Sequence, residues 1–290
     1  MSETGKKLIV TGSGGQLGRA VKKRMEDRYE LVQTDVFEGE AIRKLDITDV
    51  DAVTALVREV RPFAVINCAA YTAVDAQEQD VDNSYRINAI GPRNLAIAAE
   101  EAGIPLVHIS TDYVFAGDKE TPYTEFDKTG PISVYGKTKL AGEEFVKEFS
   151  RRHFILRTAW LYGDGKNFVK TMLKLAETRD CLSVVDDQIG NPTSADELAR
   201  AIDHLLPTGS FGTYHATCEG VCSWADFAEE IFRLAGKKVA VEHIDSEEYA
   251  RRNPQAARRP LFSHLEKMMF RLTGDFRMCD WHEAIERYLA

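Results

Sequence analysis

The sequence has no hydrophobic run long enough to cross a membrane and no excess of positive charge. A membrane-spanning helix needs about 20 consecutive apolar residues, and no segment of this 290-residue chain approaches that length. Acidic residues outnumber basic ones by 46 to 37, which gives a formal net charge of -9. Surfaces that bind nucleic acid are basic. The sequence therefore argues against both a membrane protein and a nucleic-acid-binding protein.

The sequence also lacks the paired cysteines of a disulfide-stabilised secreted protein. Its five cysteines are odd in number and scattered, as is typical of reduced thiols. Cys218 and Cys222 are spaced C-x-x-x-C, but no second ligand pair accompanies them, so we expect buried packing rather than a zinc site. Residues 1–7 carry no signal-peptide pattern. Together these absences predict a cytoplasmic protein.

What is present is an alternation of short β-branched segments with longer amphipathic ones. Strands are expected at Lys7–Thr11, Glu30–Thr34, Ala64–Asn67, Leu106–Ser110 and Phe154–Arg157. Helices are expected at Gln16–Arg28, Asp49–Val60 and Val81–Ala102, and from near Tyr135 onward. Such alternation builds right-handed βαβ units. The predicted fold class is α/β, a Rossmann-type doubly wound parallel sheet.

After about residue 160 the alternation loosens. We expect helices at Asn167–Arg179, at Ser194–Leu206 capped by Ser194 and at Ser223–Ala235 capped by Ser223, with a short strand at Gly212–Thr217. We interpret residues 1–160 as a dinucleotide-binding domain, to which residues 193–216 return. Residues 161–192 and 217–290 are expected to form a smaller, partly discontinuous lobe that binds the substrate.

A glycine-rich segment lies between the first expected strand and the first expected helix. Gly12, Gly15 and Gly18 give the spacing G-x-x-G-x-x-G. Small residues let the chain turn sharply and approach a pyrophosphate, while the helix N-terminus offers unpaired N–H groups to that anion. The segment therefore predicts a dinucleotide site, the alternative being a structural turn without a ligand.

Asp35 follows the second strand, where a carboxylate can accept hydrogen bonds from an adenosine ribose. This position favours a 2′-hydroxyl over a 2′-phosphate and hence NADH over NADPH, although a solvated loop acid is a competing interpretation. Asp46 and Ile47 are expected to flank the adenine. Small residues at 67–70 (Asn-Cys-Ala-Ala) suit a cofactor crossing the sheet edge, or tight helix packing.

Tyr135 and Lys139 are predicted to form the proton-transfer pair. Spaced i, i+4, they share one face of a helix. A tyrosine has an ordinary pKa of about 10, and a neighbouring ammonium is expected to lower that pKa toward a useful range. Ser110 and Thr111 end the preceding strand and offer a hydroxyl to a substrate carbonyl oxygen. His108 and His215 are interpreted as packed core histidines.

These motifs together resemble the short-chain dehydrogenase/reductase superfamily, and the glycine spacing resembles its extended branch, which acts largely on nucleotide sugars. Within that branch the chain is most similar to the dTDP-4-dehydrorhamnose reductase family. The motifs that carry this resemblance are residues 67–75 (NCAAYTAVD), 110–115 (STDYVF), 157–162 (RTAWLY), 187–193 (DQIGNPT) and 258–260 (RRP).

The resemblance implies reduction of a C4 ketone on a dTDP-linked 6-deoxyhexose by NADH or NADPH, with Tyr135 delivering the proton. It assigns the catalytic role to Tyr135, Lys139 and Thr111. The implied cofactor residues are Gly12, Gly15, Gln16, Leu17, Gly18, Asp35, Asp46, Ile47, Ala69, Ala70, Tyr71 and Lys139. The implied substrate residues are Thr72, Val74, Thr111, Asp112, Tyr135, Trp160 and Arg259. It also admits a homodimer and a Mg²⁺ ion, for which no ligands can be assigned.

Three functional alternatives are distinguished by particular residues. A dehydratase would carry a second carboxylate after Asp112, where this chain has Tyr113. A regulatory NAD(P)-binding subunit, like relatives that partner methionine adenosyltransferase, would not need an intact Tyr135, Lys139 and Thr111. An epimerase or a reductase of another nucleotide sugar would use the same residues and stays open. The roles of four further cations are also left open: Arg251, Arg252, Arg258 and Arg259.

Overall fold

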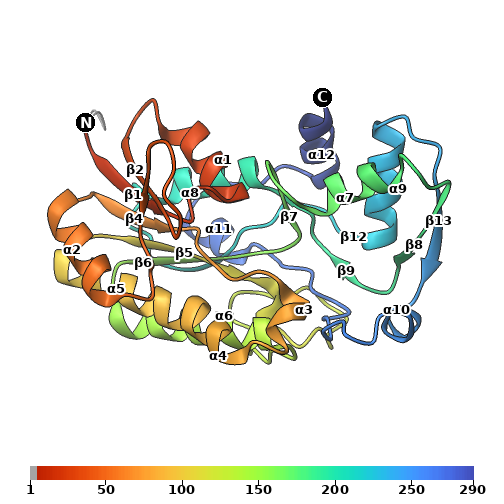
Figure 1. Cartoon of the computed structure of the whole chain (residues 1–290), viewed down its shortest axis with the longest axis horizontal. Coiled ribbons are helices and arrows are strands. Elements are labelled where there is room, and N and C mark those ends of the chain that lie inside the picture. Colours follow the sequence, from red (N-terminus) through yellow and green to blue (C-terminus); the bar gives the residue numbers. More distant parts are fainter. Residues whose placement is uncertain (1–4) are drawn as a thin grey trace.

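The computed structural model describes residues 5–290. The prediction that residues 1–7 carry no signal peptide therefore falls partly outside the described residues. At its centre is a seven-stranded sheet with the order β11-β6-β5-β4-β1-β2-β3 (Figure 1). Every pairing in this sheet is parallel. The strands are β1 (Lys7–Thr11), β2 (Glu30–Asp35), β3 (Ile42–Lys44), β4 (Ala64–Asn67), β5 (Leu106–Thr111), β6 (His153–Thr158) and β11 (Gly212–His215). The predicted doubly wound α/β fold is confirmed.

Helices cover both faces of the sheet and supply two separate apolar cores. On one face lie α1 (Gln16–Met25), α8 (Ala195–Leu205) and α11 (Met268–Thr273). On the other lie α2 (Val50–Val60), α5 (Gly91–Ala102) and α6 (Val134–Phe149). Because both faces are covered, β4 is buried along its whole length, as expected for a central parallel strand.

The segment predicted as one helix over residues 81–102 contains a π-helical turn. It comprises α4 (Val81–Tyr85), the π-helix η1 (Arg86–Ile90) and α5. Within η1, the Asn88 side chain accepts a hydrogen bond from Tyr71 N (2.8 Å) and donates one to Tyr71 O (3.0 Å). The turn therefore fixes the loop after β4, which leads into the short helix α3 (Val74–Gln77).

The rest of the chain forms a smaller lobe beside the sheet (Figure 1). Its elements are β7 (Leu161–Tyr162), α7 (Phe168–Leu175), β8 (Cys181–Val185), β9 (Ile189–Gly190), β10 (Thr193–Ser194), β12 (Cys222–Ser223), α9 (Trp224–Leu234), β13 (Ala240–Ile244), α10 (Ser246–Arg252) and α12 (Trp281–Leu289). The predicted caps are confirmed: Ser194 caps α8, and Ser223 forms a capping box with Asp226. The domain boundaries drawn from the sequence stay a prediction.

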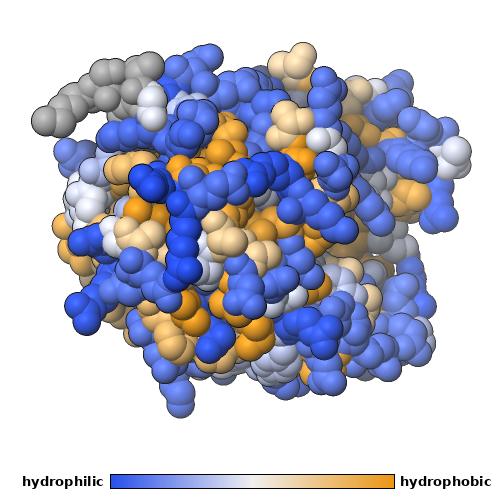
Figure 2. All heavy atoms as spheres, turned by 60° about the vertical axis from the view of Figure 1, so that its left-hand side comes forward, coloured by the Kyte–Doolittle hydropathy of each residue, from blue (hydrophilic) through white to orange (hydrophobic). Residues whose placement is uncertain are grey.

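The surface of the molecule is largely polar. Figure 2 shows charged and polar side chains over most of one face, with apolar side chains gathered in limited patches between them. No helix among residues 5–290 is long and apolar enough to span a membrane.

The strand order reverses between β1 and β4, and the chain makes a very close backbone contact there. Gly12, directly after β1, has a φ of +61°, and a Cβ at this position would lie 2.6 Å from Ala69 N. A Cβ at Gly18 would lie 2.5 Å from Ser13 Cα. Ligands of such sheets bind at the reversal point, beyond the carboxyl ends of the strands.

We predict that Gly12→Ala lowers the free energy of unfolding by about 2–4 kcal/mol. A positive φ costs a non-glycine residue about 1 kcal/mol, and the backbone overlap adds strain of about 1–3 kcal/mol. Gly209→Ala is the matched control, because Gly209 also has a positive φ of +68° but nothing within 4 Å of an added Cβ. Urea unfolding measures both variants, and equal losses would contradict the close-contact explanation.

Candidate active site

The glycine turn presents free backbone N–H groups at the start of α1. The N-cap residue Gly15 has no side-chain cap, so the first N–H groups of a ten-residue helix are available to an anion. Gly14 N donates to Asp35 Oδ2 at 3.0 Å, and Val36 N donates to Asp35 Oδ1 at 2.8 Å. The carboxylate thus joins the end of β2 to the turn, and each oxygen keeps acceptor capacity for a ribose hydroxyl.

Two adjoining cavities lie along the carboxyl edge of the sheet. The first, of about 540 Å³, contains Asp35, Asp46 and Ile47, as expected for an adenosine site. The second, of about 430 Å³, contains Thr111, Tyr135 and Lys139. The two cavities share four lining residues, Gly15, Cys68, Ala69 and Ala70. Together they form one extended site of the kind a dinucleotide requires.

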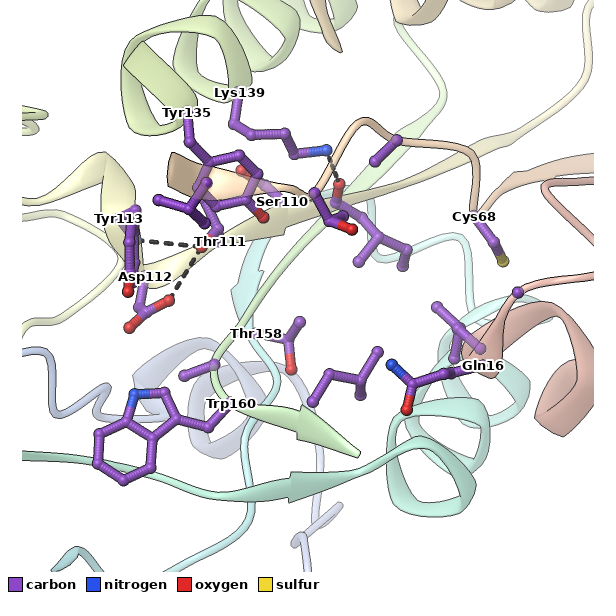
Figure 3. A pocket seen from close by; sticks show the side chains of 18 of the residues that line it. Gln16, Cys68, Ser110, Thr111, Asp112, Tyr113, Tyr135, Lys139, Thr158 and Trp160 are labelled. Atoms are coloured by element: carbon purple, nitrogen blue, oxygen red, sulfur yellow. Dashed lines mark hydrogen bonds between the residues drawn. The ribbon is translucent and has the colours of Figure 1, made fainter. Parts of the chain in front are cut away.

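The second cavity brings together side chains from widely separated segments (Figure 3). Tyr135 and Thr111 lie on one side, and Trp160 lies across the cavity from them. Gln16, Leu17, Thr72, Val74 and Asp112 also line it. Among the predicted site residues, Tyr71 lines only the first of these two cavities and Gly18 lines neither, serving instead as a packing point of the turn.

The pKa of Tyr135 departs from the expectation of a lowered value. Burial raises the pKa of Tyr135 to about 12, and the Thr111 hydroxyl opposes that shift. Lys139 does not offset it, because its Nζ donates to Ile109 O at 2.6 Å instead. Burial lowers the pKa of Lys139 to about 8, with Glu143 opposing. Near neutral pH the phenol is therefore protonated and Lys139 is close to its titration range.

The two strand-end hydroxyls, Ser110 and Thr111, both line the second cavity, and each donates to a neighbouring carboxylate. Thr111 Oγ1 donates to Asp112 Oδ1 at 2.9 Å and accepts from Tyr113 N at 3.2 Å. Ser110 Oγ donates to Glu143 Oε1 at 2.6 Å, so its hydroxyl hydrogen is already engaged, and its expected carbonyl-binding role stays a prediction. The carboxylate that engages it, Glu143, was missed by sequence reasoning because it reads as an ordinary helix-surface acid.

Tyr113 occupies the position where a dehydratase would carry its second carboxylate. Its ring packs edge-on against Tyr135, with ring centroids 5.5 Å apart and planes at 73°. Burial raises the pKa of Asp112 to about 6, opposed by hydrogen bonds from Ser263 and Thr111. The ring of Tyr113 thus lies beside Tyr135 at the place where a dehydratase needs a base. The site therefore lacks a group that dehydration requires.

Trp160 is held in an unusual conformation by the loop that carries the DQIGNPT motif. It has a φ of +48°, rare for a bulky residue and often associated with functional sites. Its ring stacks on Trp224, with centroids 3.6 Å apart. A Cβ at Gly190 would lie 2.8 Å from Trp160 Cε2. The glycine of the motif therefore leaves the space that the indole occupies.

The four-arginine cluster divides by location. Arg251 and Arg252 lie on α10, where they pair with acidic residues at the surface. Arg258 is exposed. Arg259 is mostly shielded, and its Nη2 contacts Asp75 Oδ1 at 2.8 Å. Arg259 also lines a third cavity, of about 310 Å³, which includes the apolar side chains Phe168, Met172, Val184, Val185 and Trp224.

The two histidines are core residues, as predicted. His108 Nδ1 lies 3.0 Å from Asn67 Nδ2, and burial holds the pKa of His108 well below its ordinary value. His215 is buried with its Nδ1 2.9 Å from Glu266 O. Cys218 and Cys222 are buried thiols. Residues 5–290 contain no cluster of three or more His, Cys, Asp or Glu side chains that could hold a metal ion, and the Mg²⁺ site stays unassigned.

A parallel sheet with a glycine turn after its first strand, and a Tyr–Lys helix facing a strand-end threonine, defines the short-chain dehydrogenase/reductase class. The family model described as the RmlD substrate binding domain matches residues 6–290. The chain belongs to this family, and the proteins to which it is similar include dTDP-4-dehydrorhamnose reductases.

Three relatives illustrate the similarity. A dTDP-4-dehydrorhamnose reductase of Sinorhizobium fredii is 39% identical over 293 residues, covering 97% of this chain and 96% of that protein. A crystal structure of a dTDP-4-dehydrorhamnose reductase from Clostridium acetobutylicum is 49% identical, with a TM-score of 0.92 and 98% of each chain covered. The Bacillus anthracis reductase, solved in complex with NADP, is 43% identical, with a TM-score of 0.92 and 98% and 99% of the two chains covered.

We predict that Gly190→Ala displaces the Trp160 indole and breaks its stack on Trp224. The added methyl group would overlap the ring, and the coupled near-ultraviolet circular dichroism of the two indoles should collapse. Gly274→Ala is the control, because a Cβ at Gly274 meets nothing within 4 Å. An unchanged indole spectrum in Gly190→Ala would refute this account of the motif glycine.

Proposed function

We propose that the protein reduces the C4 ketone of dTDP-4-dehydro-β-L-rhamnose to dTDP-β-L-rhamnose, with NADH or NADPH as the hydride donor. The observation that carries this proposal is a protonated Tyr135 facing Thr111 and Trp160 in a cavity that continues into the dinucleotide turn. Membership of the family supports a dTDP-linked sugar as the substrate and a role in dTDP-rhamnose biosynthesis.

The residues around the turn fit a dinucleotide. The N–H groups at the start of α1 would receive the pyrophosphate, Asp35 the adenosine ribose, and Lys139 the nicotinamide ribose. Asp46, Ile47, Ala69, Ala70 and Tyr71 line the adenosine half. When bound, NADH or NADPH supplies the hydride, while the protein positions the reactants and supplies the proton.

Proton delivery suits the reductive direction. A ketone that accepts a hydride develops negative charge on its oxygen and needs a proton donor within hydrogen-bond reach. Tyr135, with a pKa of about 12, carries its proton throughout the neutral range. Lys139, one helical turn from Tyr135, would hold the nicotinamide ribose rather than lower the resting pKa of the tyrosine. Thr111 holds the substrate oxygen against Tyr135, and Trp160 closes the opposite side of the sugar.

The nucleotide half of the substrate would extend into the third cavity. Its apolar wall includes Phe168, Met172 and Trp224, a suitable surface for a nucleobase. Arg259 lies at the same cavity and matches a diphosphate in charge and geometry. Asp75 neutralises part of that charge, so Arg259 would orient the diphosphate rather than dominate binding.

Tyr135→Phe should abolish reduction while leaving cofactor binding intact. Loss of the proton donor is expected to lower kcat by about 10²–10⁴-fold, measured as oxidation of NADH or NADPH with dTDP-4-dehydro-β-L-rhamnose. Tyr113→Phe, which removes a neighbouring phenol hydroxyl but keeps the ring against Tyr135, should retain most of kcat. No turnover by the wild type despite cofactor binding would overturn the proposed function, and full activity of Tyr135→Phe would overturn the mechanism.

Asp35 should set the cofactor preference toward NADH, because its carboxylate repels a 2′-phosphate. Asp35→Ala is expected to weaken NADH binding and to raise the ratio of NADPH to NADH in kcat/KM by about tenfold or more. Asp46→Ala, which removes a charge farther along the same cavity, is the comparison. An unchanged ratio in Asp35→Ala would show that another group selects the cofactor.

A further inference from the structure

Glu143 is a buried carboxylate that the proposed proton transfer does not use. It lies one turn beyond Lys139 on α6 and is fully shielded from solvent. Its oxygens accept hydrogen bonds from Ser110 Oγ (2.6 Å), Arg157 Nε (2.8 Å) and Arg157 Nη2 (2.7 Å). Lys147 Nζ approaches to 3.5 Å from the following turn. This group therefore joins α6 to β5 and β6 behind the cavity.

The position of Ser110 makes this connection relevant to the reaction. Ser110 stands between Ile109, whose carbonyl oxygen holds Lys139 Nζ at 2.6 Å, and Thr111, whose hydroxyl faces Tyr135. Fixing Ser110 fixes the direction of both neighbours at the end of β5. Displacements of about 1 Å at a reacting centre can cost about 10²-fold in rate.

We propose that Glu143, held by Arg157, is a positioning residue for the reaction. Through Ser110 it sets the end of β5, and through its charge it keeps the Lys139 ammonium beside Tyr135. It touches neither the substrate nor the cofactor. This inference rests on the proposed function and names a residue outside the set that acts on the reactants.

Stability alone does not account for the buried ion pair between Glu143 and Arg157. Replacing a buried ion pair by apolar residues of similar volume is often neutral or stabilising, because both charges give up their hydration. Here the Arg157 guanidinium packs over the Phe115 ring, 5.0 Å from its centroid, in surroundings that an apolar side chain would also fill. What an apolar replacement would lose is the hydrogen bond to Ser110 and the charge near Lys139.

The charges around Lys139 determine the expected pH effect. The titratable groups that face Lys139 are Glu143 on its own helix and His108 on β5, while Tyr135 and Cys68 line the same cavity. Behind Glu143 lie Arg157 on β6 and Lys147 on the next turn of α6. Tyr135, His108 and Cys68 are uncharged near neutral pH. Glu143 is the charge that opposes the effect of burial on the ammonium, so removing it should lower the Lys139 pKa further.

Glu143→Gln tests the proposal. We expect kcat to fall by about 10–100-fold, with the affinity for NADH at pH 6 unchanged and the alkaline limb of kcat moved to lower pH. The pH dependence of NADH affinity should move in the same direction, and this readout needs no sugar substrate. A wild type without turnover would therefore overturn the proposed function, while the NADH titration would still decide on Glu143.

Two further variants separate positioning from folding. Glu197→Gln is the control, because Glu197 is a buried helical carboxylate paired with Arg200 and bonded to Cys279 N, outside the three cavities. It should lower Tm but keep the kcat and pH profile of the wild type. If Glu143→Gln does not fold, the double variant Glu143→Leu/Arg157→Met should fold and show the same loss. Wild-type kcat and an unshifted pH profile in either Glu143 variant would overturn the proposal.

Discussion

The site depends on the backbone contact between the glycine turn after β1 and the loop after β4. Because no side chain separates Gly12 from Ala69, the two strand ends open directly onto a shared crevice. The two cavities along the sheet edge share Gly15, Cys68, Ala69 and Ala70 at this contact. In the proposed function the dinucleotide would cross the sheet edge here, with its nicotinamide end toward β5.

Burial, more than charge pairing, sets the acid–base properties of the site. It raises the pKa of Tyr135 to about 12 and lowers that of Lys139 to about 8. The ordinary pKa values of tyrosine and lysine are similar, and burial moves them apart. An acid that keeps its proton thus shares a cavity with a lysine close to its titration range, an arrangement suited to reducing a ketone.

The sequence was sufficient for the parts of the fold governed by local patterns. The sheet strands β1 and β4, the glycine turn and the caps Ser194 and Ser223 were predicted because hydrophobic periodicity and capping chemistry are local. The strand β3 was missed, since three residues, of which only Ile42 is partly buried, are too few to carry a pattern. Five further elements were also missed, because they are short or pair over long separations in the sequence: β8, β13, α10, α11 and α12.

For the site, motif spacing predicted that Thr111, Tyr135 and Lys139 lie together, and the family resemblance added Trp160; all four line one cavity. It could not reveal that Ser110 donates its hydroxyl hydrogen to Glu143, because the spacing does not show which helix carboxylate reaches the end of the strand. The direction of the Tyr135 pKa shift was also beyond reach. That shift depends on how much solvent the folded cavity excludes, which no spacing encodes.

One amide links the glycine turn to the last helix. Asn167 Nδ2 lies within hydrogen-bond distance of Gln16 Oε1 (3.1 Å) and Tyr288 Oη (3.2 Å), and Tyr288 in turn donates to Gly163 O. A ligand that holds Gln16 at the turn would therefore also favour the docked position of α12, and such coupling would be reciprocal. Dinucleotide binding would slow amide hydrogen exchange in the last helix, and fraying of that helix would lower the affinity for the dinucleotide.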